Sequence, residues 1–90
     1  MKYEFKSSFE RDLKKAPVFL KIGVLEIVEN IKNANNLNEI EGIKKMVGSK
    51  NAYRIRTKNI KDFRIGFKLV DEIIILSRLL ARKEIYKNFP

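Results

Sequence analysis

The sequence contains no cysteine and no histidine. Without cysteine, the chain can form neither a disulfide framework nor a thiolate metal site. Without histidine, it lacks the usual general base near neutral pH and the commonest metal ligand among side chains. Any chemistry must therefore use carboxylates, lysine, arginine, tyrosine or serine, and we expect neither a metal ion nor another cofactor.

Long apolar stretches are also missing. The longest apolar run, residues 73–76, has the length of a strand, whereas a membrane span needs ~18 residues. The first five residues alternate charge with apolar bulk and show no signal-peptide region. We therefore expect a cytoplasmic protein with no membrane partner, and a length of 90 residues fits a single domain, residues 1–90.

Acidic residues are scarce beside basic ones: 11 Asp and Glu against 20 Lys and Arg leave a net charge of +9. Such a surplus attracts polyanions and suits a nucleic acid or an acidic protein partner. A basic protein with no such ligand would have the same composition, so charge alone leaves both interpretations open.

The first third of the chain has the pattern of a strand followed by two helices. Apolar and charged residues alternate over residues 2–6, which predicts a half-buried strand. Residues 7–10, Ser-Ser-Phe-Glu, have the spacing of a capping box and predict a short helix up to Lys15. Pro17 suits the first turn of a second helix, whose apolar positions recur every three or four residues up to about Ala34.

After Gly42 the apolar period changes from helical to two, which is typical of strands. The pattern predicts four strands, a polar loop at residues 58–62 and a short terminal turn or helix. The strands are expected at residues 43–47, 52–57, 63–70 and 73–80, and the turn or helix at 82–89. This order predicts an α+β domain: an N-terminal strand, then a two-helix hairpin packed on one face of a twisted antiparallel sheet of about four strands.

Basic residues gather on one predicted face of the sheet. Strand alternation puts Arg54 and Arg56 on the same face, ~7 Å apart. Arg64 and Lys68 should share it, because the apolar residues of their strand claim the core side. An anionic ligand would explain the cluster, whereas ordinary solvated positions of amphipathic strands would need no ligand. Gly66 indicates either the close approach of a ligand or another backbone, or a bulge.

Tyr86 follows Arg82 and Lys83 near the end of the sequence. An aromatic ring among cations can stack on a base or position a hydroxyl group. A tyrosine that only packs the last turn onto the sheet is the alternative.

These segments resemble the RelE/ParE toxin superfamily. Ala-Tyr-Arg-Ile-Arg at 52–56, Asp-Phe-Arg-Ile-Gly-Phe at 62–67 and Arg-Lys-Glu-Ile-Tyr-Lys-Asn-Phe-Pro at 82–90 are similar to three blocks that the family carries in this order, and residues 9–15 resemble its first helix. The resemblance spans essentially the whole chain. It implies a RelE-like fold and a type II toxin neutralised by an acidic antitoxin.

For RelE-like members, the resemblance implies binding of mRNA on the ribosome and metal-independent cleavage by attack of the ribose 2′-hydroxyl on the adjacent phosphate. Arg54 and Arg56 fall where the family places basic residues beside the scissile phosphate. Arg64 falls on its phosphate-binding arginine, and Tyr86 on the tyrosine near the attacking hydroxyl or stacked on a base. The expected catalytic residues are Arg54, Arg56, Arg64 and Tyr86, and the expected RNA-binding residues are Lys50, Lys68, Arg82 and Lys83.

Two positions depart from the family's pattern. Leu80 and Ala81 stand where members often have arginine and histidine, so a proton donor or phosphate ligand is missing. An arginine in place of a lysine cannot act as a base, because guanidinium stays charged, which leaves Glu84 and Tyr86 as candidates. The departures indicate either weak activity or an attenuating alanine at 81. The alternatives to a nuclease are a ParE-like toxin that inhibits DNA gyrase and an inactive member that acts by binding.

Overall fold

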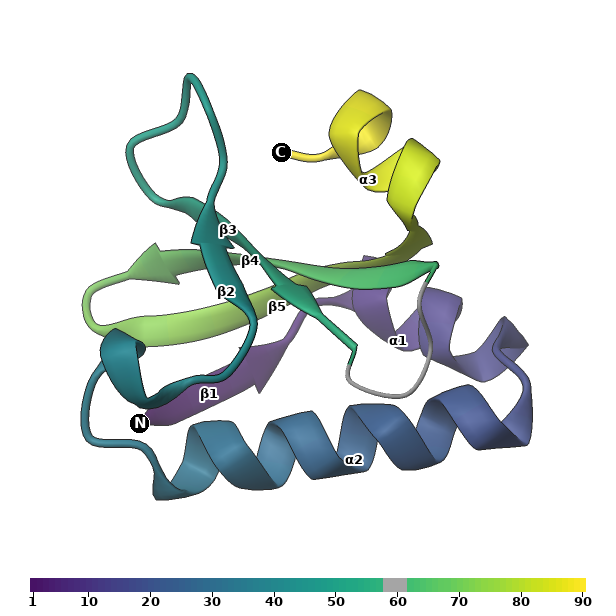
Figure 1. Ribbon diagram of the computed structural model, residues 1–90, viewed down its shortest axis with the longest axis horizontal. Helices are drawn as coiled ribbons and strands as arrows, with labels where there is room; N and C mark the ends of the chain where they lie inside the picture. The colour runs from purple at the N-terminus through teal and green to yellow at the C-terminus, as the bar shows by residue number, and fades with distance from the viewer. Residues whose placement is uncertain (58–61) are drawn as a thin grey trace.

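Residues 1–57 and 62–90 are described in a computed structural model (Figure 1). The predicted polar loop at residues 58–62 therefore falls mostly outside the described residues. The predicted α+β architecture is confirmed. In chain order the elements are β1 (Lys2–Phe5), α1 (Ser7–Lys15), α2 (Val18–Asn33), a 3-10 turn η1 (Leu37–Glu39), β2 (Ile43–Lys45), β3 (Ala52–Arg56), β4 (Phe63–Val70), β5 (Ile73–Ala81) and α3 (Arg82–Asn88). No helix within the described residues has both the length and the apolar character that crossing a bilayer requires.

The sheet has five strands in the order β1-β5-β4-β3-β2. Strands β2 to β5 form the antiparallel part that the sequence predicts. The N-terminal strand joins them as a parallel neighbour of β5, with Lys2 opposite Ile73 and Phe5 opposite Leu76. The sheet is therefore mixed, and β5 is an interior strand, as its apolar residues on both faces indicate.

The capping box predicted at residues 7–10 is wrong. Helix α1 follows β1 directly: its N-cap is Lys6, and no side chain caps it. The neighbouring Ser8 Oγ donates to the carbonyl oxygen of Ser77 at 2.6 Å. The backbone N–H of Lys6 still donates to the carbonyl oxygen of Leu76 at 2.9 Å. This bond brings the first turn of α1 against β5. Ser7, which the capping box would have used as the N-cap, is instead the first residue of the helix.

An aspartate of α1 completes the edge of β5. The described pairing of β1 with β5 ends at Leu76. Beyond it, the Asp12 carboxylate accepts from the backbone N–H of Leu79 at 3.0 Å and from Arg78 Nε at 2.7 Å. One side chain thus satisfies a strand donor that has no strand partner and fixes α1 to the sheet.

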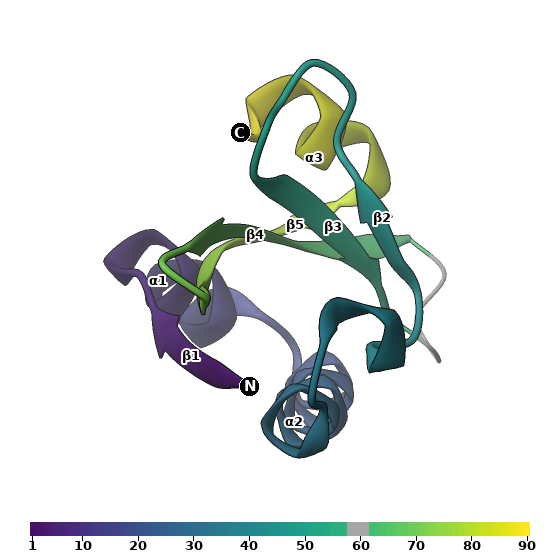
Figure 2. The same ribbon diagram turned by 90° about the vertical axis from the view of Figure 1, so that its left-hand side faces the viewer.

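Both faces of the sheet carry packed helices. Helices α1 and α2 lie on one side and α3 on the other, as Figure 1 and Figure 2 show. The main core fills the first side, and its fully buried side chains include Phe9, Leu20, Ile31, Ile65 and Phe67. A smaller cluster fills the α3 side: Met46, Ala52, Ile85 and Phe89, with Leu80 against them. The face that we expected to be an open basic surface is therefore partly covered by α3.

The turn between β4 and β5 has a left-handed backbone at both of its central residues. Asp71 has a φ of 51° and Glu72 a φ of 66°. Tight two-residue hairpin turns need positive φ at both positions, which glycine adopts freely and glutamate does not. The conformation of Glu72 should therefore cost roughly 1–2 kcal/mol.

We expect Glu72→Gly to raise the free energy of unfolding by up to about 1 kcal/mol, because the strain that glycine removes exceeds the chain entropy that it adds. Urea denaturation followed by circular dichroism measures the change. Gly48→Ala is the matched change of opposite sign: Gly48 has a φ of 81° and no atom within 4 Å of its Cβ position, so alanine there meets strain without collision. A Glu72→Gly protein no more stable than the parent would show that the turn is unstrained.

Candidate active site

Two neighbouring strands place arginines directly opposite one another. In the β3–β4 register, Arg56 pairs with Arg64 and Arg54 pairs with Gly66. On its other side Arg64 lies opposite Leu80, which packs against the cluster beneath α3. These arginines therefore occupy the face on which α3 lies. Like charges directly opposite destabilise a sheet, so packing alone does not explain the pair, whereas an anionic ligand would.

Arg54 is fixed between the start of β2 and helix α3. Its Nη1 donates to the carbonyl oxygen of Gly42 at 2.8 Å, and its Nε donates to Tyr86 Oη at 3.2 Å. Gly42 has a φ of 75°, and a Cβ added there would lie 3.1 Å from the carbonyl oxygen of Arg56. A side chain at residue 42 would therefore be crowded against the backbone of Arg56. The contact joins two predicted site residues that are 32 positions apart in the sequence.

Arg64 lies deeper than expected. The interpretation of Arg64 as a solvent-side cation is wrong: only 5% of its surface is exposed, because α3 contacts both β4 and β5 and covers this face. Its Nη1 donates to the carbonyl oxygen of Phe63 at 2.9 Å. Burial lowers the pKa of the Arg64 guanidinium from its usual value, and the charges of Arg54, Arg56 and Arg82 lower it further. A bound anion would offset all of these effects.

The Tyr86 phenol stands in the field of these cations. Desolvation alone would raise its pKa, but the hydrogen bond and charge of Arg54 lower it. The charges of Arg64 and Lys44 act in the same direction, so that the pKa falls below its usual value of about 10.0. A lowered pKa favours the phenolate. Tyr86 can therefore serve as a proton acceptor at lower pH than an ordinary tyrosine.

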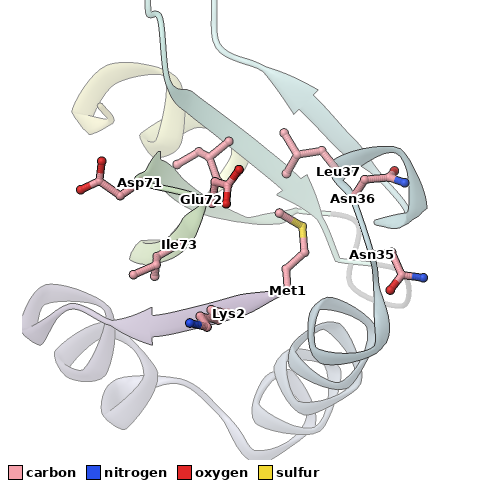
Figure 3. Close-up of a pocket in the computed structure, with 9 residues that line it drawn as sticks. Met1, Lys2, Asn35, Asn36, Leu37, Asp71, Glu72 and Ile73 are labelled. Carbon is pink, nitrogen blue, oxygen red and sulfur yellow. The ribbon is translucent and has the colours of Figure 1, made fainter.

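The cavity shown in Figure 3 lies elsewhere in the molecule. It has a volume of about 560 Å³ and opens between the start of β1, the segment after α2 and the β4–β5 turn. Its lining residues are Met1, Lys2, Asn35, Asn36, Leu37, Leu69, Asp71, Glu72 and Ile73. None of the clustered arginines reaches it, and its two carboxylates would repel a polyanion. The candidate site is therefore the cationic cluster beside α3.

Known proteins are similar to this chain in both sequence and fold. The sequence is 41% identical over 91 aligned residues to a toxin named RelE3 from Methanocaldococcus jannaschii, and the alignment covers 100% of both proteins. A chain in the crystal structure of a RelB–RelE antitoxin–toxin complex from Methanococcus jannaschii is 38% identical, with a TM-score of 0.75 over 96% of this chain and 98% of that one. The chain belongs to the RelE family of toxins.

More distant members of the RelE family share the fold alone. The isolated RelE toxin of E. coli is 15% identical, with a TM-score of 0.66 over 96% of this chain and 90% of that one. No family model matches the sequence. The predicted membership of the RelE/ParE superfamily is confirmed by the relatives themselves.

The predicted RNA-binding residues of this RelE-family chain lie in several places. Arg82 is exposed at the start of α3, and its charge acts on the arginine cluster. Lys50, in the β2–β3 turn, and Lys83, on α3, are exposed. Lys68 lines a separate cavity of about 280 Å³ together with Phe89. Of the four, Arg82 is the one that the structure brings to the cluster.

Lys44 is a cluster residue that the sequence analysis does not select. It lies opposite Arg54 in the β2–β3 register, and its charge lowers the pKa of Tyr86. The sequence predicts the strand at residues 43–47 but not the register of its pairing. Without the register, strand alternation cannot say which residues of two strands meet.

The pKa of the Tyr86 phenol should rise in Arg54→Gln. The hydrogen bond and the charge of Arg54 are the largest of the effects that stabilise the phenolate, and this change removes both. Carbon-13 NMR of the tyrosine rings measures the ionisation. The folded parent binds fewer protons than the unfolded chain between the lowered pKa and about 10.0, so its free energy of unfolding should rise with pH across that interval, and Arg54→Gln should reduce this rise.

Lys32→Gln is the matched control for Arg54→Gln, because Lys32 is an exposed cation in the last turn of α2, on the other side of the sheet. It should leave the pKa of Tyr86 unchanged. The same pKa in Arg54→Gln and in the parent would contradict the contact between Arg54 and Tyr86.

Proposed function

We propose that this RelE-family chain is a type II toxin that cleaves mRNA as an endoribonuclease without a metal ion. The proposal rests chiefly on the Arg64 guanidinium, which is buried among other cations and near an aromatic hydroxyl. A phosphate group would relieve both the burial of the charge and the repulsion. The RelE3 toxin and the RelB–RelE complex support the assignment as a toxin with an antitoxin partner.

Tyr86 and the arginines can divide the chemistry between them. The ribose 2′-hydroxyl gives its proton to the Tyr86 phenolate oxygen. The 2′-oxygen then bonds to the adjacent phosphorus, and negative charge builds on the phosphorane oxygens. The bond from phosphorus to the 5′-oxygen breaks, and that oxygen takes a proton from water. The products are a 2′,3′-cyclic phosphate and a 5′-hydroxyl end.

Arg54 and Arg64 supply the positive charge that the phosphorane needs. A guanidinium presents parallel N–H donors that match two phosphate oxygens, and it stays charged throughout. Donors fixed in advance stabilise developing charge better than mobile water does. A metal ion is not needed for this step, and the described residues hold no group of three or more acidic side chains placed to bind one.

Tyr86 is a better candidate for the proton acceptor than Glu84. Glu84 Oε2 accepts a hydrogen bond from Asn88 Nδ2 at 2.8 Å on the exposed surface of α3.

The family's usual proton donor for the leaving oxygen is missing. Leu80 packs against the small apolar cluster, and Ala81 is the N-cap of α3. Neither Leu80 nor Ala81 can protonate the leaving oxygen, so we infer a slow nuclease in which water does so.

Arg64→Met tests the nuclease assignment. Loss of one donor to the phosphorane should slow cleavage roughly 10²–10³-fold. The free energy of unfolding should change little, because methionine fills similar space and removes both the hydrogen bond to Phe63 and the buried charge among cations. Mapping of mRNA 3′ ends on translating ribosomes gives the rates, and urea denaturation gives the stability. Lys32→Met, which removes an exposed cation on the far side of the sheet, should change neither.

Two results would count against this assignment. An Arg64→Met protein that cleaves at the parent's rate would show that Arg64 does not contact the reacting phosphate. A folded parent that produces no new 3′ ends would exclude the nuclease, and would favour a toxin that binds DNA gyrase or a member that acts by binding alone.

An acidic antitoxin segment is the proposed protein partner. The net charge of +9 favours an acidic chain that folds over the basic face or beside it. Relatives of this chain have been solved as RelB–RelE complexes, including one from Mycobacterium tuberculosis named RelBE2 that is 19% identical to it over 90% of this chain and 96% of that one, with a TM-score of 0.69.

Affinity for the cognate antitoxin should fall at least roughly tenfold between about 50 mM and about 500 mM salt, because added ions screen attraction between exposed opposite charges. Isothermal titration calorimetry at several salt concentrations measures the slope. An uncharged osmolyte at matched osmolality is the control and should have little effect. Affinity that is independent of salt would mean that apolar contacts, rather than charge, hold the complex.

A further inference from the structure

Helix α3 is too short to be stable without contacts to the rest of the protein. It has 7 residues, and Ile85 is the one that is buried. A helix of this length is unstable in isolation, because few hydrogen bonds repay the cost of nucleation. Tyr86 is 53% exposed, so its own ring contributes little packing. The place of the Tyr86 hydroxyl must therefore be set by contacts that its neighbours make.

Phe89 is the bulkiest apolar side chain beneath α3. It follows the helix directly, and its backbone N–H donates to the carbonyl oxygen of Ile85 at 3.1 Å, which ties the ring to the last turn. Only 5% of Phe89 is exposed, and the ring belongs to the cluster with Met46 and Ala52. The position of α3 on the sheet therefore depends on where this ring lies.

The Phe89 ring packs directly on the backbone of Gly66, and we call this packing position its seat. A Cβ atom on residue 66 would lie 2.6 Å from Cδ2 of Phe89 and 2.8 Å from Cε2 and Cγ. Packed atoms do not approach so closely, so any side chain at this position would displace the ring. Gly66 also lies directly opposite Arg54, which donates to the Tyr86 hydroxyl. The seat of the ring and the partner of the hydroxyl are thus neighbours across one strand pair.

We propose that Phe89, seated on Gly66, is a positioning residue that holds α3 on the sheet and thereby holds the Tyr86 hydroxyl against Arg54. Its effect on catalysis rests on the proposed nuclease function, whereas its effect on the hydroxyl does not. Loss of the ring leaves Arg54 and Arg64 on their strands, while Tyr86 moves away from Arg54 together with the end of α3. The main core lies on the other face of the sheet, so the fold should survive this loss.

Phe89→Ala and Phe89→Leu form the central comparison. Carbon-13 NMR follows the ionisation of Tyr86, whose signal is assigned with Tyr86→Phe. In Phe89→Ala, the pKa of Tyr86 should rise to about its value in Arg54→Gln, and cleavage should slow about 10²-fold, as for a catalytic group misplaced by about 1 Å. Phe89→Leu refills most of the seat and should restore most of both properties.

Gly66→Ala tests the same seat from the sheet side and keeps every apolar side chain. It should reproduce the changes of Phe89→Ala in the presence of the ring. In the Phe89→Ala background it should add little, because the ring that it would meet is gone. Phe19→Ala is the control: Phe19 is 62% exposed on α2, on the other side of the sheet, and its loss should change neither property.

A purely structural role for Phe89 predicts lower thermal stability with an unchanged pKa of Tyr86 and unchanged cleavage, and that result overturns the proposal. A shifted pKa in proteins that, like the parent, cut no RNA would support the positioning role and reject the nuclease function. If Phe89→Ala does not fold, Gly66→Ala decides: an unchanged pKa of Tyr86 in that variant also overturns the proposal.

Discussion

Repulsion between like charges is the main constraint that the fold must overcome. Arg56 and Arg64 are paired across β3 and β4, Arg54 lies two residues from Arg56, and Arg64 is buried. Both features raise the free energy of the folded state, because facing like charges repel and a buried charge loses hydration. The fold tolerates them because a separate apolar core on the other side of the sheet supplies stability. The main core and the arginine cluster thus lie on opposite faces of one sheet.

Local patterns predict the elements because their causes are local. The alternation that marks β4 and the proline that precedes α2 depend only on near neighbours, and both elements have nearly the expected bounds. The capping box is an equally local signal, yet it is wrong, because the helix begins one residue earlier, with Lys6 at the end of the β1–β5 pairing as its N-cap. A local signal therefore fails where a long-range strand pairing sets the residue at which the helix begins.

In the candidate site, too, local patterns predict some features, whereas others depend on long-range contacts. Alternation predicts a shared face for the arginines of β3 and β4, and their register agrees. The burial of Arg64 and its closeness to Tyr86 depend on where α3 docks, and no periodicity encodes the docking of a short terminal helix. For Gly66 the sequence leaves open a close approach or a bulge. The structure has a register shift between Gly66 and Phe67, and the group that approaches Gly66 is the Phe89 side chain rather than a ligand or another backbone.

Fold and site therefore differ in what they require of the sequence. The RelE fold persists at 15% identity in the E. coli toxin, so most of the individual side chains of this chain are not required for it. The proposed site needs a residue without a side chain at 66, an aromatic ring at 89 and a cation beside the Tyr86 hydroxyl. These requirements come from different elements and are coupled through packing, so a change in one is tolerated only when the others compensate. A different C-terminal segment would remove the proposed proton acceptor and leave the main core, which lies on the other face of the sheet, in place.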